Sequence, residues 1–223
     1  MVNGSVDIST PLMDLVHLHP AVQVTFYLIY GSIFTVGVCG NVLVCFVVCT
    51  NRAMQTVTNL FIANLALSDI LLCVLAVPFT PFYLFGRQWK FGAFLCHLVS
   101  YVQGVSVYVS TLTLTSIAID RFLVILYPFK PRMRMSTCVV IICAIWLLAL
   151  CATLPYGIYV GLTSVNGTLY CEENWESTDW RLVFGSVTTV MQFVVPFIIM
   201  AVAYSMVLKI IINFSTLLFL LIS

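Results

Sequence analysis

Charged side chains are scarce in this sequence. Only 8% of its 223 residues are Asp, Glu, Lys or Arg, whereas 62% are apolar, and the formal net charge is +1. About a quarter of the residues of an ordinary soluble domain are charged. The composition therefore excludes a soluble globular domain, a disordered tail and a nucleic-acid-binding protein with a basic face, and it favours a protein embedded in a lipid bilayer.

Five stretches are apolar and long enough to cross a bilayer, which takes about 20 residues. Charged residues separate these stretches, and Asp69 alone interrupts the second. The sequence predicts an all-α membrane protein with helices at about 22–50, 59–85, 91–119, 137–159 and 182–208. Strands do not account for these stretches, because they are too long and lack sustained alternation of apolar and polar residues. We therefore divide the chain into a tail of residues 1–21, a helical region of residues 22–209 and an apolar tail of residues 210–223.

The distribution of basic residues predicts the orientation of the chain. If the N-terminus is extracellular, six basic residues lie in cytoplasmic segments and three lie outside, and cytoplasmic loops are enriched in Lys and Arg. Two glycosylation sequons, at Asn3 and Asn166, then lie outside, and a third at Asn213 lies inside, where it is not used. We expect a multi-pass protein of the plasma membrane with an extracellular N-terminus.

The sequence contains nine cysteines, of which seven lie in apolar segments or on the cytoplasmic side. A small buried thiol is the usual role of such residues. Only Cys96, at the outer end of the third helix, and Cys171, in the loop before the fifth, lie clearly outside. Since the outside is oxidising, we expect these two to form a disulfide.

A carboxylate within a membrane span requires partners, because its insertion near the bilayer centre costs at least about 2.5–3.5 kcal/mol. Asp69 lies about 14 Å into the second helix, as judged from the helical rise. Asn41 of the first helix and Ser110 of the third lie at a similar depth. These three residues could form a cluster that holds a proton or a small cation such as sodium. The alternative is a protonated Asp69, hydrogen-bonded within a packed bundle.

Motifs in every span resemble those of the rhodopsin-like (class A) G-protein-coupled receptors, in the same order along the chain. The resemblance rests on Gly40-Asn41-Val42-Leu43-Val44, Asn64-Leu65-Ala66-Leu67-Ser68-Asp69, Trp89-Lys90-Phe91-Gly92 before Cys96, Trp146, Pro155, Pro196 and Tyr204. Asp120-Arg121-Phe122 stands where the family carries Asp-Arg-Tyr. The resemblance implies that Asp120 and Arg121 couple to a heterotrimeric G protein, whereas a solvated helix end is the structural alternative.

Within this family, the segments around Gln103, Ser110 and Cys171 are most similar to the prolactin-releasing peptide receptors, beside those for neuropeptide Y and neuropeptide FF. This resemblance implies an amidated neuropeptide as ligand and a pocket that includes Thr80, Tyr83 and Gln103. Glu172, Glu173 and Glu176 supply carboxylates in the same outer loop, which suits a basic peptide. For any one of these glutamates, a solvated loop position is the alternative.

The sixth and seventh helices of the family have no counterpart here, and residues 210–223 carry no charge. We therefore expect a receptor truncated after its fifth helix, with a separate apolar tail, that does not signal by itself. One alternative is a short form that binds full-length receptor in an oligomer and retains it in the endoplasmic reticulum, since unpaired helix faces seek partners besides membrane lipid. A membrane transporter is a less supported alternative, because no internal repeat is present. No catalytic set or metal site is evident, so an enzyme is not expected.

Overall fold

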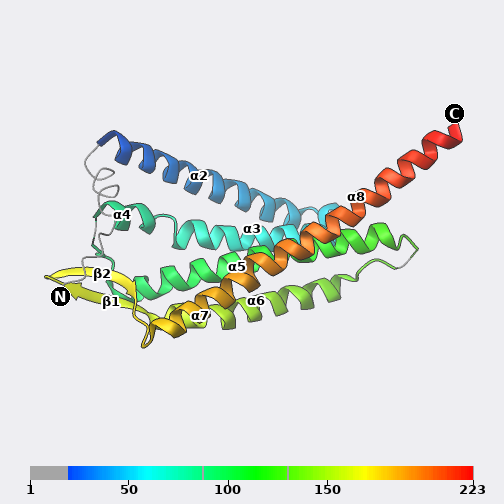
Figure 1. The fold of residues 1–223 in the computed structure, drawn as a ribbon. Coiled ribbons are helices and arrows are strands. Elements are labelled where there is room, and N and C mark those ends of the chain that lie inside the picture. Colours follow the sequence, from blue (N-terminus) through cyan, green and yellow to red (C-terminus); the bar gives the residue numbers. More distant parts are fainter. Residues whose placement is uncertain (1–19, 87, 130, 223) are drawn as a thin grey trace.

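A computed structural model describes residues 20–222 except 87 and 130, with side chains described as far as residue 213. Five helical segments in this part of the chain are long and apolar enough to cross a membrane. They lie side by side in one bundle (Figure 1). Their elements are α2 (Pro20–Thr50), α3 (Val57–Leu75) with α4 (Phe79–Gly86), α5 (Gly92–Leu126), α6 (Met135–Tyr159), and α7 (Thr178–Thr189), η2 (Val190–Val194) and α8 (Val195–Ile222). The predicted membrane bundle of five spans is confirmed.

Two of the five spans are not single regular helices. The second is interrupted by a turn at residues 76–78 between α3 and α4. Pro78 explains this break, because proline has no backbone N–H and disfavours helical geometry in the residue before it. In the fifth span, one π-helical turn, η2, separates α7 from α8.

Two helices extend beyond their predicted ends. The third helix, α5, continues past Asp120 and Arg121 to Leu126. The fifth span continues past residue 209, because α8 runs without a break to Ile222 and projects beyond the bundle (Figure 1). Residues 210–222 contain neither proline nor glycine, so nothing in their sequence ends the helix.

A β-hairpin that the sequence analysis did not anticipate follows α6. Its strands β1 (Val160–Val165) and β2 (Thr168–Glu173) are antiparallel, and Val165 pairs with Thr168 next to the turn. The turn residues Asn166 and Gly167 have φ angles of 51° and 80°. Positive φ at both central residues is typical of a type I′ turn, for which Asn-Gly is the preferred sequence. A polar loop segment therefore becomes a short sheet at one end of the bundle, which we call the hairpin end.

The predicted disulfide is present and attaches the hairpin to the bundle. Cys96, in the first turns of α5, is bonded to Cys171 of β2, with Cα atoms 5.7 Å apart and 75 residues between them in sequence. The backbone N–H of Trp89 also donates to the carbonyl of Leu169, at 2.7 Å. Two loops that are far apart in sequence are thus joined at the hairpin end.

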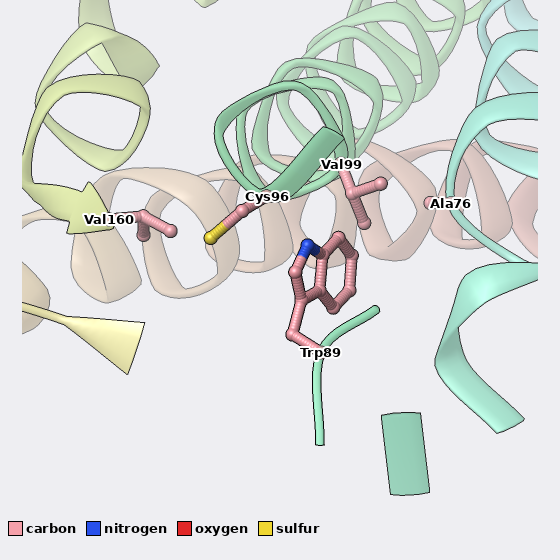
Figure 2. Packing of buried hydrophobic residues seen from close by; sticks show 5 residues of the cluster. All are labelled: Ala76, Trp89, Cys96, Val99 and Val160. Atoms are coloured by element: carbon pink, nitrogen blue, oxygen red, sulfur yellow. The ribbon is translucent and has the colours of Figure 1, made fainter. Parts of the chain in front are cut away.

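A small apolar core supports this junction. Figure 2 shows the Trp89 indole beside Val99, with Cys96 and Val160 on one side and Ala76 on the other. The indole N–H donates to the carbonyl of Gly92 at 2.8 Å, so its polar atom is satisfied. This core fixes the start of α5 relative to the hairpin.

Candidate functional site

A cavity of about 430 Å³ lies under the hairpin. Its wall combines residues of α5, the end of α6, the hairpin and η2, and includes Gln103, Val107, Tyr156, Glu172, Gln192 and Phe193. We call it the hairpin cavity. The disulfide determines its shape, because Cys171 itself lines it and is held against α5 by its bond to Cys96. Pockets of 300–1,000 Å³ with a few polar groups are typical of small-ligand sites.

Of the six residues predicted to bind a ligand, three line this cavity. Gln103, Glu172 and Glu173 belong to its wall. Tyr83 does not, because its hydroxyl donates to the Cys171 carbonyl at 3.3 Å and its ring packs against Trp89. The Thr80 hydroxyl donates to the Ala76 carbonyl, in the turn before α4, at 3.3 Å.

The three acidic residues of the loop lie in different surroundings. Glu173 accepts a hydrogen bond from the Trp175 indole at 3.0 Å and forms an ion pair with Arg181 at 3.3 Å. Glu172 lies on the cavity wall without an ion pair among the described residues. Glu176 is exposed, as Glu172 is, but it lies outside the hairpin cavity. Only Glu172 thus offers the cavity a carboxylate that no described cation neutralises.

Sequence reasoning missed Gln192, which lines the same cavity from η2. It is half-buried, and no hydrogen bond of its side chain occurs within the described part of the chain. Its position as a carboxamide within the long apolar run of the fifth span was the available signal. Gln103 of α5 and Gln192 thus provide uncommitted amide donors and acceptors on two walls.

The predicted cluster at mid-depth forms only in part. The Ser110 hydroxyl donates to Asp69 Oδ1 at 3.3 Å and lies 2.9 Å from the Ser68 hydroxyl, so α3 and α5 are joined. Asn41 is not brought to this cluster, because its amide donates at 2.8 Å to the carbonyl of Gly37 in its own helix. Equal depth along three helices did not determine which way each side chain points.

A second polar network, which the depth argument did not identify, joins three helices. The Asn64 amide donates to the Thr113 hydroxyl, and the Trp146 indole donates to the Asn64 carbonyl, both at 2.8 Å. Asn64 and Thr113 are buried, so each polar atom that pairs here avoids the cost of lying unpaired in an apolar environment. The network fixes α3, α5 and α6 relative to one another.

Asp120 and Arg121 lie at the opposite end of the bundle, which we call the Arg121 end. Asp120 is only 7% exposed, whereas Arg121 is exposed and donates to the Thr58 hydroxyl of α3. No ion pair joins these two neighbours in the described chain. Both line a cavity of about 380 Å³ that also includes Arg132. Phe129, three residues past the end of α5, is fully exposed.

Comparison with known proteins agrees with this arrangement. The protein-family model described as "7 transmembrane receptor (rhodopsin family)" matches residues 40–216 of this chain. The chain belongs to the rhodopsin family of seven-transmembrane receptors. This is a family of receptors and not of enzymes. Within the described residues, no group of three or more His, Cys, Asp or Glu is placed to hold a metal ion.

Similar members of the rhodopsin family include several neuropeptide receptors. The chain is 34% identical to the neuropeptide receptor npr-1 of Caenorhabditis elegans, with 84% of this chain and 42% of that protein covered. It is 36% identical to neuropeptide FF receptor 2 of Rattus norvegicus (89% and 51%) and 34% identical to the RYamide receptor of Tribolium castaneum (80% and 52%). The chain therefore spans about half the length of these relatives.

Proposed function

We propose that this chain supplies the first five helices of a plasma-membrane receptor for an amidated neuropeptide, with its hairpin end and N-terminus outside the cell. The observation that carries the proposal is the hairpin cavity, in which a carboxylate and two carboxamides lie beneath a disulfide-bonded hairpin. The names of the relatives, which include receptors for neuropeptide FF and RYamide, support a ligand of this class.

The chemistry of the cavity suits the end of a peptide that carries arginine next to an aromatic amide. Its volume of about 430 Å³ admits a few side chains and not a folded ligand. Glu172 can accept charge-assisted hydrogen bonds from a guanidinium group. The carboxamides of Gln103 and Gln192 can each donate to and accept from a terminal amide, while Tyr156 and Phe193 offer aromatic surface. Prolactin-releasing peptide remains the narrower ligand prediction, on the sequence resemblance described above.

Glu172 and Glu176 provide a matched test of this proposal. Glu172→Gln should weaken the binding of a peptide ending in Arg-Phe-amide roughly 10- to 150-fold, since a hydrogen bond to a charged group contributes about 1.5–3 kcal/mol. Glu176→Gln removes the same charge from the same loop outside the cavity and should change affinity less than about twofold. Binding is measured on a chimera in which the second half of rat neuropeptide FF receptor 2 completes the chain.

A peptide in which citrulline replaces arginine separates a direct contact from a general field effect. Citrulline lacks the positive charge, so its peptide should bind the original chimera weakly and should lose little further affinity on Glu172→Gln. Equal effects of the two glutamate substitutions, or full sensitivity of the citrulline peptide to Glu172→Gln, would contradict the proposed contact.

The Arg121 end is proposed to bind a heterotrimeric G protein. Phe129 is fully exposed and lies in the loop after α5, three residues before Arg132, which lines the same cavity as Arg121. An exposed aromatic side chain is a common anchor in protein complexes. In the chimera, Phe129→Ala should abolish peptide-stimulated nucleotide exchange without changing peptide affinity, whereas Phe129→Leu should retain part of it. Residues 1–223 expressed alone should produce no calcium or cyclic AMP response, and a response would contradict the need for further helices.

The proposal also includes a small cation at Asp69. The carboxylate of Asp69 and the hydroxyls of Ser110 and Ser68 place oxygen ligands of α3 and α5 together, and oxygen ligands suit hard cations. Asn41 contributes nothing to this set as it stands. Such an ion would stabilise the arrangement of α3 and α5 that it binds.

A further inference from the structure

The tip of the hairpin presents an asparagine in an unusual setting. Asn166 and Gly167 are the two central residues of the turn, and both are exposed. Thr168 follows as the first residue of β2. Asn166-Gly167-Thr168 is a glycosylation sequon, so the acceptor amide lies at the exposed turn of the hairpin.

The disulfide identifies the compartment in which this turn lies. Thr168 is only three residues from Cys171, on the same strand, and Cys171 is bonded to Cys96. Such a bond forms in an oxidising compartment such as the lumen of the endoplasmic reticulum, where N-linked oligosaccharides are also attached. This argument from the structure is independent of the count of basic residues.

The turn lies beyond the end of α6 and away from the hairpin cavity. Asn166 is seven residues past the end of α6 at Tyr159, which is about 23 Å at the rise of a β-strand. It is five residues from Cys171 on the cavity wall, or about 16 Å along the hairpin. In Figure 1 the tip extends past the ends of the helices. An attached group therefore has room in solvent.

The other described sequon does not share these properties. Asn213 lies within α8, which runs away from the hairpin end and beyond the far side of the bundle (Figure 1). Its backbone is helical and belongs to the opposite end of the molecule from the disulfide. Asn213 thus serves as an internal control. The expected site at Asn3 lies outside the described residues.

We propose that Asn166 carries an N-linked oligosaccharide at the hairpin tip. The donor is a lipid-linked oligosaccharide diphosphate. The Asn166 Nδ2 atom forms a bond to the anomeric carbon C1, and the C1–O bond to the lipid diphosphate breaks. The lipid diphosphate leaves with the bonding electron pair, and Nδ2 loses one proton. This proposal stands whether or not the cavity binds a peptide.

The test expresses residues 1–223 in mammalian cells, with Asn3→Gln as background so that the N-terminal tail cannot contribute. Mobility on a denaturing gel is compared before and after treatment with an amidase that removes N-linked oligosaccharides. Asn166→Asp keeps a residue that tolerates positive φ, and Thr168→Val keeps a β-branched strand residue, yet each destroys the sequon. Thr168→Ser preserves the sequon, and Asn213→Gln removes only the control site.

The expected result is an amidase-sensitive shift in the Asn3→Gln background, in its Thr168→Ser derivative and in its Asn213→Gln derivative. Asn166→Asp and Thr168→Val should each abolish the shift. Mass spectrometry of the peptide linked through Cys96 and Cys171 verifies that each variant folded in the oxidising compartment. The proposal is overturned if the Asn3→Gln background shows no shift, or if the shift persists in Asn166→Asp. It is also overturned if Asn213→Gln loses the shift, because the opposite end of the bundle would then lie in the lumen.

Discussion

Replacing Gly37 with alanine is expected to destabilise the contact between α2 and α3. A Cβ atom at Gly37 would lie 2.6 Å from Cys73 Sγ and 3.9 Å from Cys73 Cβ. Carbon atoms in favourable contact are about 3.5–4.0 Å apart, so the new methyl group would overlap the sulfur by about 1 Å. Cys73 is buried, which limits its freedom to move aside.

Two other glycines of α2 provide the reference for the magnitude. Nothing lies within 4 Å of a Cβ built at Gly31 or Gly40, so alanine there should gain only its higher helix propensity, about 0.5–1 kcal/mol. Overpacking costs about 1–3 kcal/mol. A loss of 1 kcal/mol lowers the melting temperature of a chain of this size by roughly 2–4 °C. The Gly37→Ala variant should therefore have a melting temperature about 2–12 °C below that of the Gly40→Ala variant.

The assay heats detergent-solubilised protein and measures the monomer that remains by size-exclusion chromatography. The decisive comparison repeats Gly37→Ala in a Cys73→Ala background, where the nearest remaining side-chain atom is the Cβ at 3.9 Å. In that background the cost of Gly37→Ala should disappear. The reasoning is refuted if the Gly37→Ala and Gly40→Ala variants have the same melting temperature. It is also refuted if Gly37→Ala lowers the melting temperature equally with and without the Cys73 sulfur.

Three further predictions concern the polar contacts between helices. Trp146→Phe should lower the free energy of unfolding by about 1–3 kcal/mol, because it leaves the buried Asn64 carbonyl without its donor, and thermal unfolding measures this loss. Thr58→Ala should raise ligand-independent nucleotide exchange in the chimera, because Arg121 loses its hydrogen-bond acceptor on α3. Thr58→Ser keeps the hydroxyl and should exchange nucleotide at the original rate. An unchanged basal rate in Thr58→Ala would show that this bond does not restrain Arg121. Asp69→Asn should remove any effect of sodium concentration on peptide affinity, because the carboxylate ligand is lost. Peptide affinity is measured in sodium chloride and in potassium chloride at equal ionic strength. A sodium effect that persists in Asp69→Asn would place the ion elsewhere.

The sequence by itself determined the number of spans, their approximate ends and the disulfide. These follow from local composition, because a run of about 20 apolar residues has few alternatives to a membrane helix, and from the small number of cysteines outside the apolar segments. Pro78 also carried the signal for the break in the second span, although the predicted helix at 59–85 runs through it.

Only the tertiary structure decided which polar side chains meet. Asn41 turns back to Gly37, while Asn64 reaches Thr113 and Trp146, although all lie in similar apolar runs. The helices are apolar around most of their circumference, since lipid and protein neighbours are both apolar, so periodicity does not specify how each helix is rotated. That rotation is fixed by contacts between distant segments, such as the hydrogen bond from Trp146 to Asn64. The fold of the loop before α7 likewise pairs Glu173 with Arg181 and leaves Glu172 for the hairpin cavity.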